Sequence, residues 1–338
     1  MKNVFYFKKI SSIGGVESTL YYLSKLYKNM VVYYKEADPK QIERLAKNIE
    51  VHKYTKPIEC DRFFCNYNYD IEVNAKEYYH IIHCDYKKVT FKPFVYPGFK
   101  YIGVSKLVCN SFYELTGIKA ELIYNPVAIE KPIVEKKKGL HLISATRGSS
   151  EKGIDRINKL ARILDNNGID YTWEVYSNRH FNIGSPNIIK KDTKLDLTKE
   201  IAESTYLVQL SSHEAFGLSV AEALTLGTPV IVTDIPAFRE IGCIHGKNSI
   251  ICDLDMKNVD VEMIKKGIPK FEYKPPKSNW GKYLDNDTDY DPKDLIKVRT
   301  KKRIWDMETN IHYPVNKEID LSKARASYME ALDYVEVL

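Results

Sequence analysis

Two glutamates in residues 211–224 have side chains that could bind one ligand at two points. Glu222 stands in a stretch that predicts a helix over residues 218–226, and its neighbours there are Val220, Ala221, Ala223 and Leu224. A carboxylate among apolar residues is costly unless it meets hydrogen-bond donors, and sugar hydroxyls are suitable donors. Glu214 precedes this helix in a loop with Gly217 and can point into a cleft. The alternative is that both glutamates are ordinary surface residues.

Two cations flank a second segment, residues 146–153. Arg147 and Lys152 stand five positions apart around the loop Gly148-Ser149-Ser150, just before a predicted helix. An arginine can donate two hydrogen bonds to phosphate oxygens, and a lysine adds a point charge. The free N–H groups at a helix start also favour an anion. We therefore expect phosphate binding here, against the alternative of a solvated charged loop.

A third segment, Ile13-Gly14-Gly15-Val16-Glu17-Ser18, lies between the first predicted strand and its helix. Two glycines let the backbone approach a ligand closely, and the following helix start favours a phosphate. A plain tight turn is the alternative. The spacing fits neither a dinucleotide-binding GxGxxG fingerprint nor a P-loop.

Length and composition limit the function classes. The chain has 338 residues, more than one hydrophobic core usually organises, so two domains are expected. The formal net charge of +6 is modest, and no recognition motif for DNA appears. That charge permits an anionic acceptor or a peripheral membrane contact without requiring either.

Cysteine spacing and hydropathy indicate a reduced, cytoplasmic protein. The six cysteines form no CxxC pair, and His83-Cys84-Asp85 has no second ligand pair at zinc spacing, so we expect no metal site. Asp253-Leu254-Asp255 matches an Asp-x-Asp metal motif by spacing, but it follows a predicted strand, so we interpret it as a strand-end turn. The N-terminal apolar run is too short and too charged for a signal peptide. No run of 18 apolar residues stands anywhere in the sequence.

Strand-like and helix-like runs alternate twice along the chain, which predicts an α/β fold with mostly parallel sheets. The first series covers residues 1–130, with strands expected at 4–7, 30–34, 62–66, 79–83 and 101–105 and helices at 16–28, 41–48 and 106–116. The second covers residues 131–285, with strands at 140–145, 172–176, 206–210, 230–233 and 249–252 and helices at 154–166 and 218–226. A linker is expected near residues 128–138. A ligand between two such lobes should sit at the carboxyl ends of the strands.

Residues 286–338 are expected to form a separate unit. An acidic, turn-rich segment at 285–294 predicts a linker to a small α+β appendage. A strand over 295–307, a turn at Glu308-Thr309-Asn310 and a partner strand over 311–319 predict a β-hairpin. A helix over 321–334 and a last strand over 335–338 complete it.

Taken together, these motifs resemble those of the family-four, or group-one, retaining nucleotide-sugar glycosyltransferases. The three segments above occur in that family's order. Other similar segments are Ile82-His83, Val104-Ser105, Ile123-Tyr124-Asn125-Pro126, Gly227-Thr228-Pro229-Val230-Ile231 and Ile235-Pro236-Ala237-Phe238-Arg239-Glu240. Trp280 resembles the tryptophan before the family's final crossing helix. Two departures are Gly148, where an apolar residue is usual, and Pro126-Val127-Ala128 instead of a glycine-containing turn.

The resemblance implies a GT-B fold, in which two Rossmann-like domains face a cleft, and it implies roles for ten residues. Glu214 would bind the donor sugar's hydroxyls and Glu222 the ribose, while Arg147 and Lys152 would neutralise the diphosphate. His83 would lie near the reacting face of the sugar. The remaining donor-binding residues would be Gly14, Gly15, Phe216, Gly217 and Leu218. No cofactor and no metal are implied, because the cations and helix starts do the work of a divalent ion.

The implied reaction is transfer of a hexose or N-acetylhexosamine, with retention, from a nucleotide sugar to a hydroxyl acceptor. Family frequency alone favours a UDP-sugar. The acceptor is left unassigned. Five classes are compatible: a surface polysaccharide, a teichoic-type polymer, a lipid-linked sugar, a protein and a hydroxymethylated DNA base. Two rival functions stay open as well: a non-catalytic protein that binds sugar nucleotides or a partner, and an epimerase or phosphorylase-like enzyme on the same fold.

Overall fold

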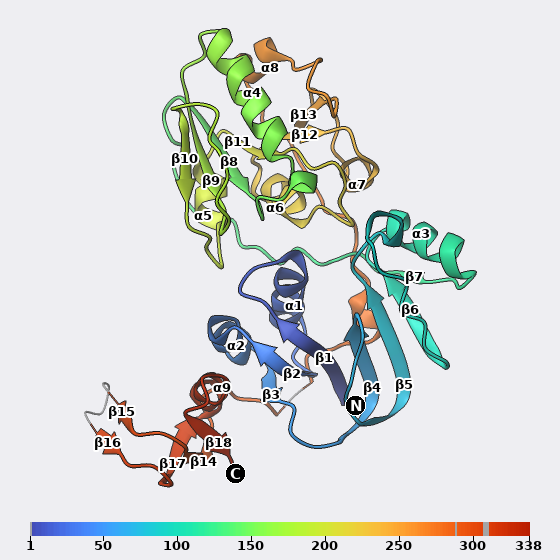
Figure 1. The fold of residues 1–338 in the computed structure, drawn as a ribbon, viewed down its shortest axis with the longest axis vertical. Coiled ribbons are helices and arrows are strands. Elements are labelled where there is room, and N and C mark those ends of the chain that lie inside the picture. The colour runs from blue at the N-terminus through green and yellow to red at the C-terminus, as the bar shows by residue number, and fades with distance from the viewer. Residues whose placement is uncertain (1, 288, 307–310) are drawn as a thin grey trace.

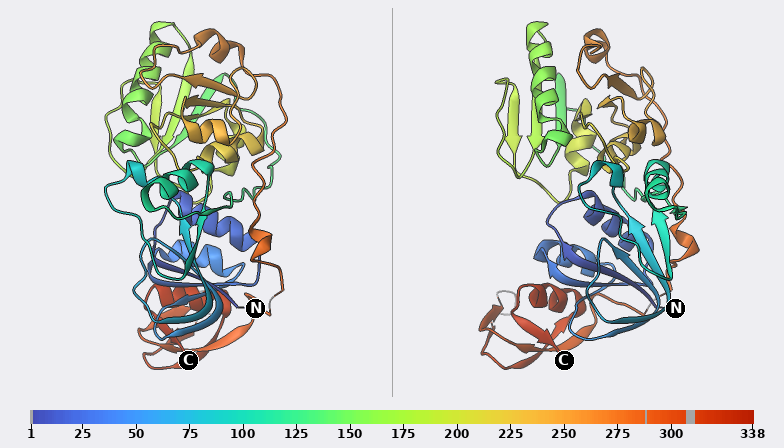
Figure 2. Two further views of the ribbon diagram at one scale, coloured as in Figure 1. Left: turned by 90° about the vertical axis from the view of Figure 1, so that its right-hand side faces the viewer. Right: turned by 45° about the vertical axis from the view of Figure 1, so that its right-hand side comes forward.

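The structure is a computed structural model that describes residues 2–287, 289–306 and 311–338. Two lobes, each built on a parallel sheet, stand one above the other, and a small appendage lies at the far end of the first lobe (Figure 1). The fold class is therefore the α/β arrangement expected from the alternation of strands and helices. Figure 2 shows from two further sides that the two lobes meet along one face only.

The first lobe carries a seven-stranded parallel sheet in the order β3-β2-β1-β4-β5-β6-β7. Its strands are β1 (Asn3–Ile10), β2 (Met30–Ala37), β3 (Glu50–Lys53), β4 (Ile58–Asn66), β5 (Val73–Ile82), β6 (Phe99–Gly103) and β7 (Glu121–Leu122). Its helices are α1 (Gly15–Leu26), α2 (Pro39–Ala46) and α3 (Lys106–Thr116). Strands buried on both faces are rich in large apolar residues, as Val4, Phe5, Tyr6 and Phe7 in β1 illustrate.

The joins from β4 to β5 and from β5 to β6 contain no α-helix. Residues 67–72 run directly from β4 to β5, and residues 83–98 join β5 to β6 through one short 3₁₀ turn, η1 (Tyr86–Lys88). Parallel strands are usually joined by a crossover of a dozen or more residues that includes a helix. Aromatic side chains, among them Tyr69 and Phe99, cover that part of the sheet instead.

The second lobe carries a six-stranded parallel sheet in the order β10-β9-β8-β11-β12-β13. Its strands are β8 (Leu140–Ala145), β9 (Tyr171–Tyr176), β10 (Ile188–Lys191), β11 (Tyr206–Gln209), β12 (Val230–Thr233) and β13 (Ser249–Cys252). Its helices are α4 (Ile154–Asn166), α5 (Thr198–Glu203), α6 (Leu218–Leu226), α7 (Pro236–Glu240) and α8 (Val261–Lys266), with a 3₁₀ turn η2 (Ser150–Lys152) before α4. Both sheets point the carboxyl ends of their strands toward the space between the lobes.

After α8 the chain returns to the first lobe. Trp280, in the 3₁₀ turn η3 (Trp280–Lys282), is fully buried there, 6.0 Å between ring centroids from Phe5 and 5.9 Å from Phe64. The long crossing helix that the resemblance placed after this tryptophan is not found in residues 283–287. The chain instead ends its return at Asp285, whose carbonyl accepts hydrogen bonds from Lys28 and Asn29. The domain boundaries expected at residues 130 and 285 stay a prediction.

The appendage is antiparallel and differs in detail from the expected hairpin. Its main sheet has the order β17-β14-β18, formed by β14 (Leu295–Thr300), β17 (Glu318–Ser322) and β18 (Val335–Val337). A separate pair, β15 (Ile304–Asp306) with β16 (Ile311–Tyr313), forms the outer hairpin, and the turn expected at residues 308–310 lies outside the described residues. The single long strands expected over 295–307 and 311–319 were therefore wrong, because each is interrupted, the first at Lys301–Arg303.

The appendage packs against the first lobe through α9 (Lys323–Ala331), which is shorter than the expected helix over 321–334. The Ser327 hydroxyl donates to the Val51 carbonyl at 3.1 Å, and α9 lies against α2. This contact lies at the side of the first lobe away from the second lobe (Figure 1).

Candidate active site

A cleft of about 1270 Å³ lies between the lobes and is lined by both of them. All ten residues expected in the site line this cleft: Gly14, Gly15, His83, Arg147, Lys152, Glu214, Phe216, Gly217, Leu218 and Glu222. They come from segments of both lobes that are far apart in the sequence, and the carboxyl ends of the parallel strands bring them together. Their roles in binding or catalysis stay predictions.

Lys152 and Glu214 contact each other in the cleft. The Lys152 ammonium donates to Glu214 Oε1 at 2.6 Å, and each side chain is only about 15% exposed (15% and 14%). The same oxygen accepts from the Ser211 hydroxyl at 2.7 Å. Sequence reasoning assigned these two residues to different parts of the donor and did not foresee that they pair. The pair compensates both charges within the protein.

The backbone conformation of Gly153 explains why the segment 146–153 lies against the segment 211–224. Its φ of +80° is the left-handed region, and a Cβ there would lie 2.0 Å from the Leu210 carbonyl oxygen. The loop before α4 therefore packs directly on the end of β11, and the Ser212 N–H donates to the Glu151 carbonyl at 2.8 Å. Only glycine permits this close approach, which holds Lys152 beside Glu214.

Glu222 is held by a residue of the other lobe. The Tyr22 hydroxyl, on α1, donates to Glu222 Oε1 at 2.7 Å. Burial raises the pKa of Glu222 to about 7, the hydrogen bond from Tyr22 opposes that rise, and nearby Asp196 adds to it. The alternative that Glu222 is an ordinary surface residue is therefore excluded. Tyr22 was not foreseen, since nothing in the sequence links positions so far apart.

The Gly14-Gly15 segment forms the start of α1, as expected. A Cβ on Gly14 would lie 2.2 Å from Glu17 Oε2, whereas a Cβ on Gly15 would meet nothing within 4 Å. Glu17 Oε1 accepts from the Ser11 N–H at 2.8 Å and so fixes the turn. Gly15 therefore presents open space to the cleft at a helix N-terminus, where a ligand can approach the backbone.

His83 and Arg147 line the cleft from opposite lobes. Burial, with a smaller contribution from His80, lowers the pKa of His83 to about 3, so its imidazole is neutral at neutral pH. Arg147 is exposed, and no ion pair is found for it within the part of the chain that the structure describes. Arg147 therefore offers an uncompensated positive charge to a ligand in the cleft.

The residues considered as metal ligands do not gather. Asp255 pairs with Lys257 at 2.8 Å, and Asp85 accepts from the Ser111 hydroxyl at 2.5 Å. Across residues 2–287, 289–306 and 311–338, no group of three or more His, Cys, Asp or Glu side chains is arranged to hold a metal ion. All six cysteines are free thiols.

Comparison with known proteins finds a family match in part of the second lobe. Residues 187–283 match the model of the family described as glycosyl transferases group 1. This segment contains Glu214, Glu222 and the helix α6 between the lobes. No curated protein sequence matches the chain.

Solved structures share the fold of the whole two-lobed unit. The Anabaena protein Alr3699/HepE, in complex with UDP and glucose, is 12% identical with a TM-score of 0.59, over 79% of this chain and 89% of its own. A glycosyltransferase from Rickettsia africae ESF-5 is 13% identical with a TM-score of 0.57, over 78% and 88%. The lipopolysaccharide outer core galactosyltransferase WaaB is 15% identical with a TM-score of 0.54, over 80% and 92%. The fold is GT-B, the two-domain arrangement of group-one glycosyltransferases.

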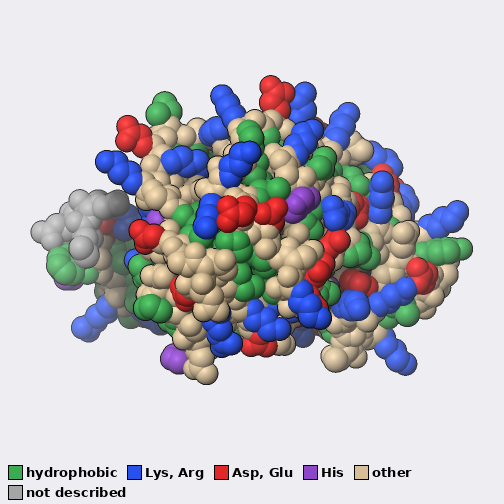
Figure 3. Space-filling model, turned by 90° about the horizontal axis from the view of Figure 1, so that it is seen from above, with side chains coloured by type: hydrophobic (Ala, Val, Ile, Leu, Met, Phe, Trp, Pro, Cys, Tyr) green, Lys and Arg blue, Asp and Glu red, His purple; other side chains and the backbone are tan. Residues whose placement is uncertain are grey.

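The distribution of charged and apolar side chains on the outer surface is relevant to membrane contact. In the view down onto the second lobe, lysines, arginines and acidic side chains alternate with small hydrophobic areas, and no single apolar face stands out (Figure 3). A search of the described residues for a helix long and apolar enough to cross a membrane finds none.

Proposed function

We propose that this protein is a nucleotide-sugar glycosyltransferase that transfers a hexose or N-acetylhexosamine, with retention, from a UDP-sugar to a hydroxyl of a glycan. The observation that carries the proposal is the cleft itself. Lys152, Glu214 and Glu222 line it from the second lobe of a GT-B fold, and Glu214 and Glu222 lie in the segment that matches the group-one family model. The likeness to a protein that holds UDP and glucose supports the choice of donor.

The chemistry divides among these residues according to where charge develops. During transfer the bond from the anomeric carbon to the diphosphate breaks, and the acceptor oxygen bonds to the same face of that carbon. The acceptor proton passes to an oxygen of the leaving phosphate, so no protein nucleophile is needed. Arg147 and Lys152 stabilise the negative charge that grows on the diphosphate. Glu214 accepts hydrogen bonds from the sugar hydroxyls and Glu222 from the ribose.

Positive charges and helix starts replace a divalent ion in this proposal, so no cofactor is required. We expect turnover to persist in excess EDTA. Complete loss in EDTA that manganese restores would contradict the metal-independent mechanism and direct attention to Asp253 and Asp255.

A thermal-shift screen of nucleotides and nucleotide sugars tests the donor assignment. A ligand that binds only the native state at a hundredfold excess over its dissociation constant adds about 2.7 kcal/mol of stability. We expect UDP and UDP-sugars to give this shift, and Lys257→Ala to preserve it, because Lys257 lies outside the cleft. The absence of a shift with every nucleoside diphosphate tested would refute the proposal.

Product analysis separates transfer from the rival functions. Release of UDP with formation of a new glycosidic bond is expected. A nucleotide sugar recovered with one inverted stereocentre would identify an epimerase, and binding without any turnover would identify a non-catalytic protein.

A further inference from the structure

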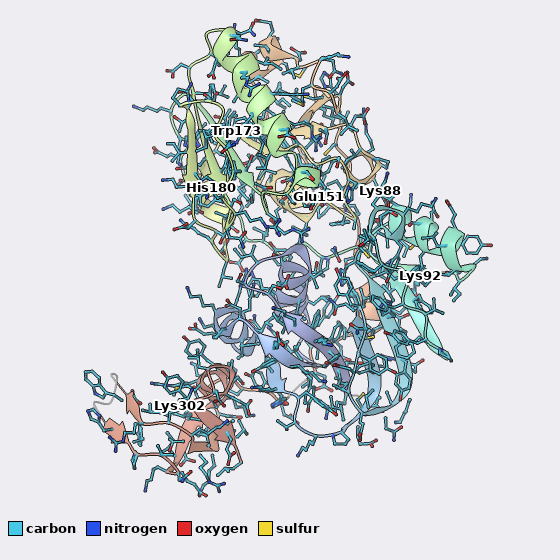
Figure 4. All side chains as sticks on the ribbon, viewed as in Figure 1. Lys88, Lys92, Glu151, Trp173, His180 and Lys302 are labelled. Carbon is cyan, nitrogen blue, oxygen red and sulfur yellow. The ribbon has the colours of Figure 1, made fainter. Side chains whose placement is uncertain are left out.

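The first lobe meets the cleft with two loops where helices are usual. Residues 67–72 and residues 83–98 follow β4 and β5 at their carboxyl ends, and Tyr67, Asn68, Lys88, Val89 and Phe91 from these loops line the cleft. Figure 4 shows Lys88 at the edge of the first lobe that faces the second. None of these residues has been given a role in holding the donor.

Two aromatic rings stand exposed in this wall, where water rather than protein covers them. Tyr67 is 39% exposed and Phe91 40%, and their ring centroids are 6.1 Å apart at an interplanar angle of 66°. Phe94 packs behind both, at 6.5 Å from Tyr67 and 5.8 Å from Phe91. We call Tyr67 and Phe91 the aromatic platform. Exposed aromatic surface inside a cleft is typical of a ligand site.

The backbone at Tyr67 is strained in a way that keeps this ring in the cleft. Its φ is +54°, a left-handed conformation that is unfavourable for a residue with a Cβ. His80 holds it: this fully buried imidazole donates from Nε2 to the Tyr67 carbonyl at 2.9 Å. Burial lowers the pKa of His80 to about 4, so the donor is a neutral imidazole. Strain that the surrounding structure maintains is found most often at functional sites.

The platform stands beside the charged part of the cleft. Burial raises the pKa of the Tyr67 hydroxyl, the Cys84 thiol adds to the rise, and the Arg147 guanidinium opposes it. The Tyr67 ring therefore lies within electrostatic reach of the cation expected to face the leaving diphosphate. A molecule resting on the platform would therefore share the cleft with that cation.

We propose that Tyr67 and Phe91 form the acceptor subsite and that the acceptor is a pyranoside. This inference rests on the proposed transferase function. One face of a pyranose ring presents C–H groups with a small positive charge, and the face of an aromatic ring is negative, so the two stack. An open-chain polyol has no such flat apolar face. The platform thus selects a sugar ring as the acceptor, whereas the cations and glutamates hold the donor.

Saturation-transfer NMR on the full-length protein with UDP present tests the subsite. The probes are the methyl β-pyranosides of glucose, galactose and N-acetylglucosamine, with glycerol as the open-chain comparison. We expect transfer to the ring C–H protons of at least one pyranoside and none to glycerol. Tyr67→Ala and Phe91→Ala should each reduce this transfer at least fivefold, whereas Tyr67→Phe, which retains the ring, should preserve it.

Tyr113→Ala is the matched control, because this tyrosine is 49% exposed on α3 and does not line the cleft. Stabilisation by UDP should be unchanged in all four variants. A protein that binds no nucleotide at all would overturn the proposed function. If the protein binds UDP, any of three results would overturn the acceptor subsite alone. These are no signal from any pyranoside, an equal signal from glycerol, or full signals in both Tyr67→Ala and Phe91→Ala.

Discussion

Lys152 and Glu222 both have ionisable side chains in the cleft, but replacing them should affect different kinetic parameters. Lys152 faces charge that grows in the transition state, so Lys152→Ala should lower kcat by roughly 10²–10³-fold. Glu222 is proposed to hold ribose hydroxyls, which change little during the reaction. Glu222→Gln should therefore raise the donor KM roughly tenfold, the signature of lost uniform binding, with a smaller effect on kcat.

Donor-saturation curves for both variants measure this difference, with circular dichroism to confirm folding. Lys152→Ala also leaves Glu214 without its cation, so Lys152→Arg, which keeps the charge, should recover more activity than the alanine variant. Loss of turnover in Glu222→Gln at unchanged donor affinity would exclude the ribose role.

The raised pKa of Glu222 predicts a pH dependence of stability. The folded protein holds a proton on Glu222 up to pH about 7, whereas the unfolded chain loses it near pH 4.5. Between these values the folded state binds more protons, so this group's contribution to the free energy of unfolding falls as pH rises. Glu222→Gln should match the wild type near pH 4.5 and be more stable by about 1–3 kcal/mol at pH 8.

Urea unfolding of both proteins across this range checks the sign. Glu262→Gln is the control, because its side chain is 84% exposed and its difference from wild type should change little with pH. A wild-type protein that is more stable than Glu222→Gln at pH 8 would contradict the burial cost.

At the scale of elements, the start of α3 connects the lobes. The Glu240 carboxylate, at the end of α7 in the second lobe, accepts from the Lys106 N–H at 2.6 Å and the Leu107 N–H at 3.3 Å. A carboxylate at a helix N-terminus contributes about 0.5–2 kcal/mol. Glu240→Ala should therefore lower stability by about that amount, widen the interlobe angle and raise the donor KM more than it lowers kcat.

Small-angle scattering and thermal unfolding measure these changes. The control is Asp234→Ala, which breaks an exposed ion pair with Arg239 inside the second lobe. Scattering and stability identical to the wild type would mean that this contact does not hold the lobes together.

Local signals in the sequence account for the elements that were predicted well. Helix α3 has the expected bounds because Ser105 accepts from the Val108 N–H at its start and Gly117 adopts a φ of +73° at its end. The short strands β3 and β10 and the helices α5 and α8 were missed because charged residues interrupt their apolar pattern, whereas the equally short strands β11, β12 and β13 are mostly apolar. The interruption in the appendage was missed because the segments on either side, Leu295–Thr300 and Ile304–Asp306, both have strand-like patterns, and the three basic residues between them were not taken as a break.

The sequence indicated which residues would lie in the candidate site, but not which of them contact each other. The residues that the motifs named all line the cleft, because all but Glu222 lie close to a strand end or a helix start. Tyr22 beside Glu222 and Lys152 beside Glu214 were not foreseen, since such pairs depend on how two sheets face each other. The aromatic platform had no sequence signal either, because its loops occupy places where helices are usual.

At the scale of the whole molecule, the appendage and the cleft are far apart. In Figure 4, Lys302 lies in the appendage at the lower end of the molecule, and Glu151 lies in the second lobe, on the other side of the first lobe. A chain ending at residue 286 should therefore keep the thermal stabilisation by UDP seen in the full-length protein. Its basal stability should fall, because α2 and β3 lose the cover of α9.

Thermal shifts of both chains with and without UDP measure this separation. A shortened chain that is folded by circular dichroism but gains nothing from UDP would show that the appendage supports the donor site.

The hydrogen bond between Tyr22 and Glu222 has a consequence for how a nucleotide enters. The protein itself places the Tyr22 hydroxyl at the carboxylate proposed for the ribose, so nucleotide binding would exchange one hydroxyl for another. The gain at this position would then be the difference between the ribose hydrogen bonds and the one from Tyr22, which is less than the ribose bonds alone would give. The same exchange moves the link between the lobes from protein to ligand, and release of the spent nucleotide lets Tyr22 restore it.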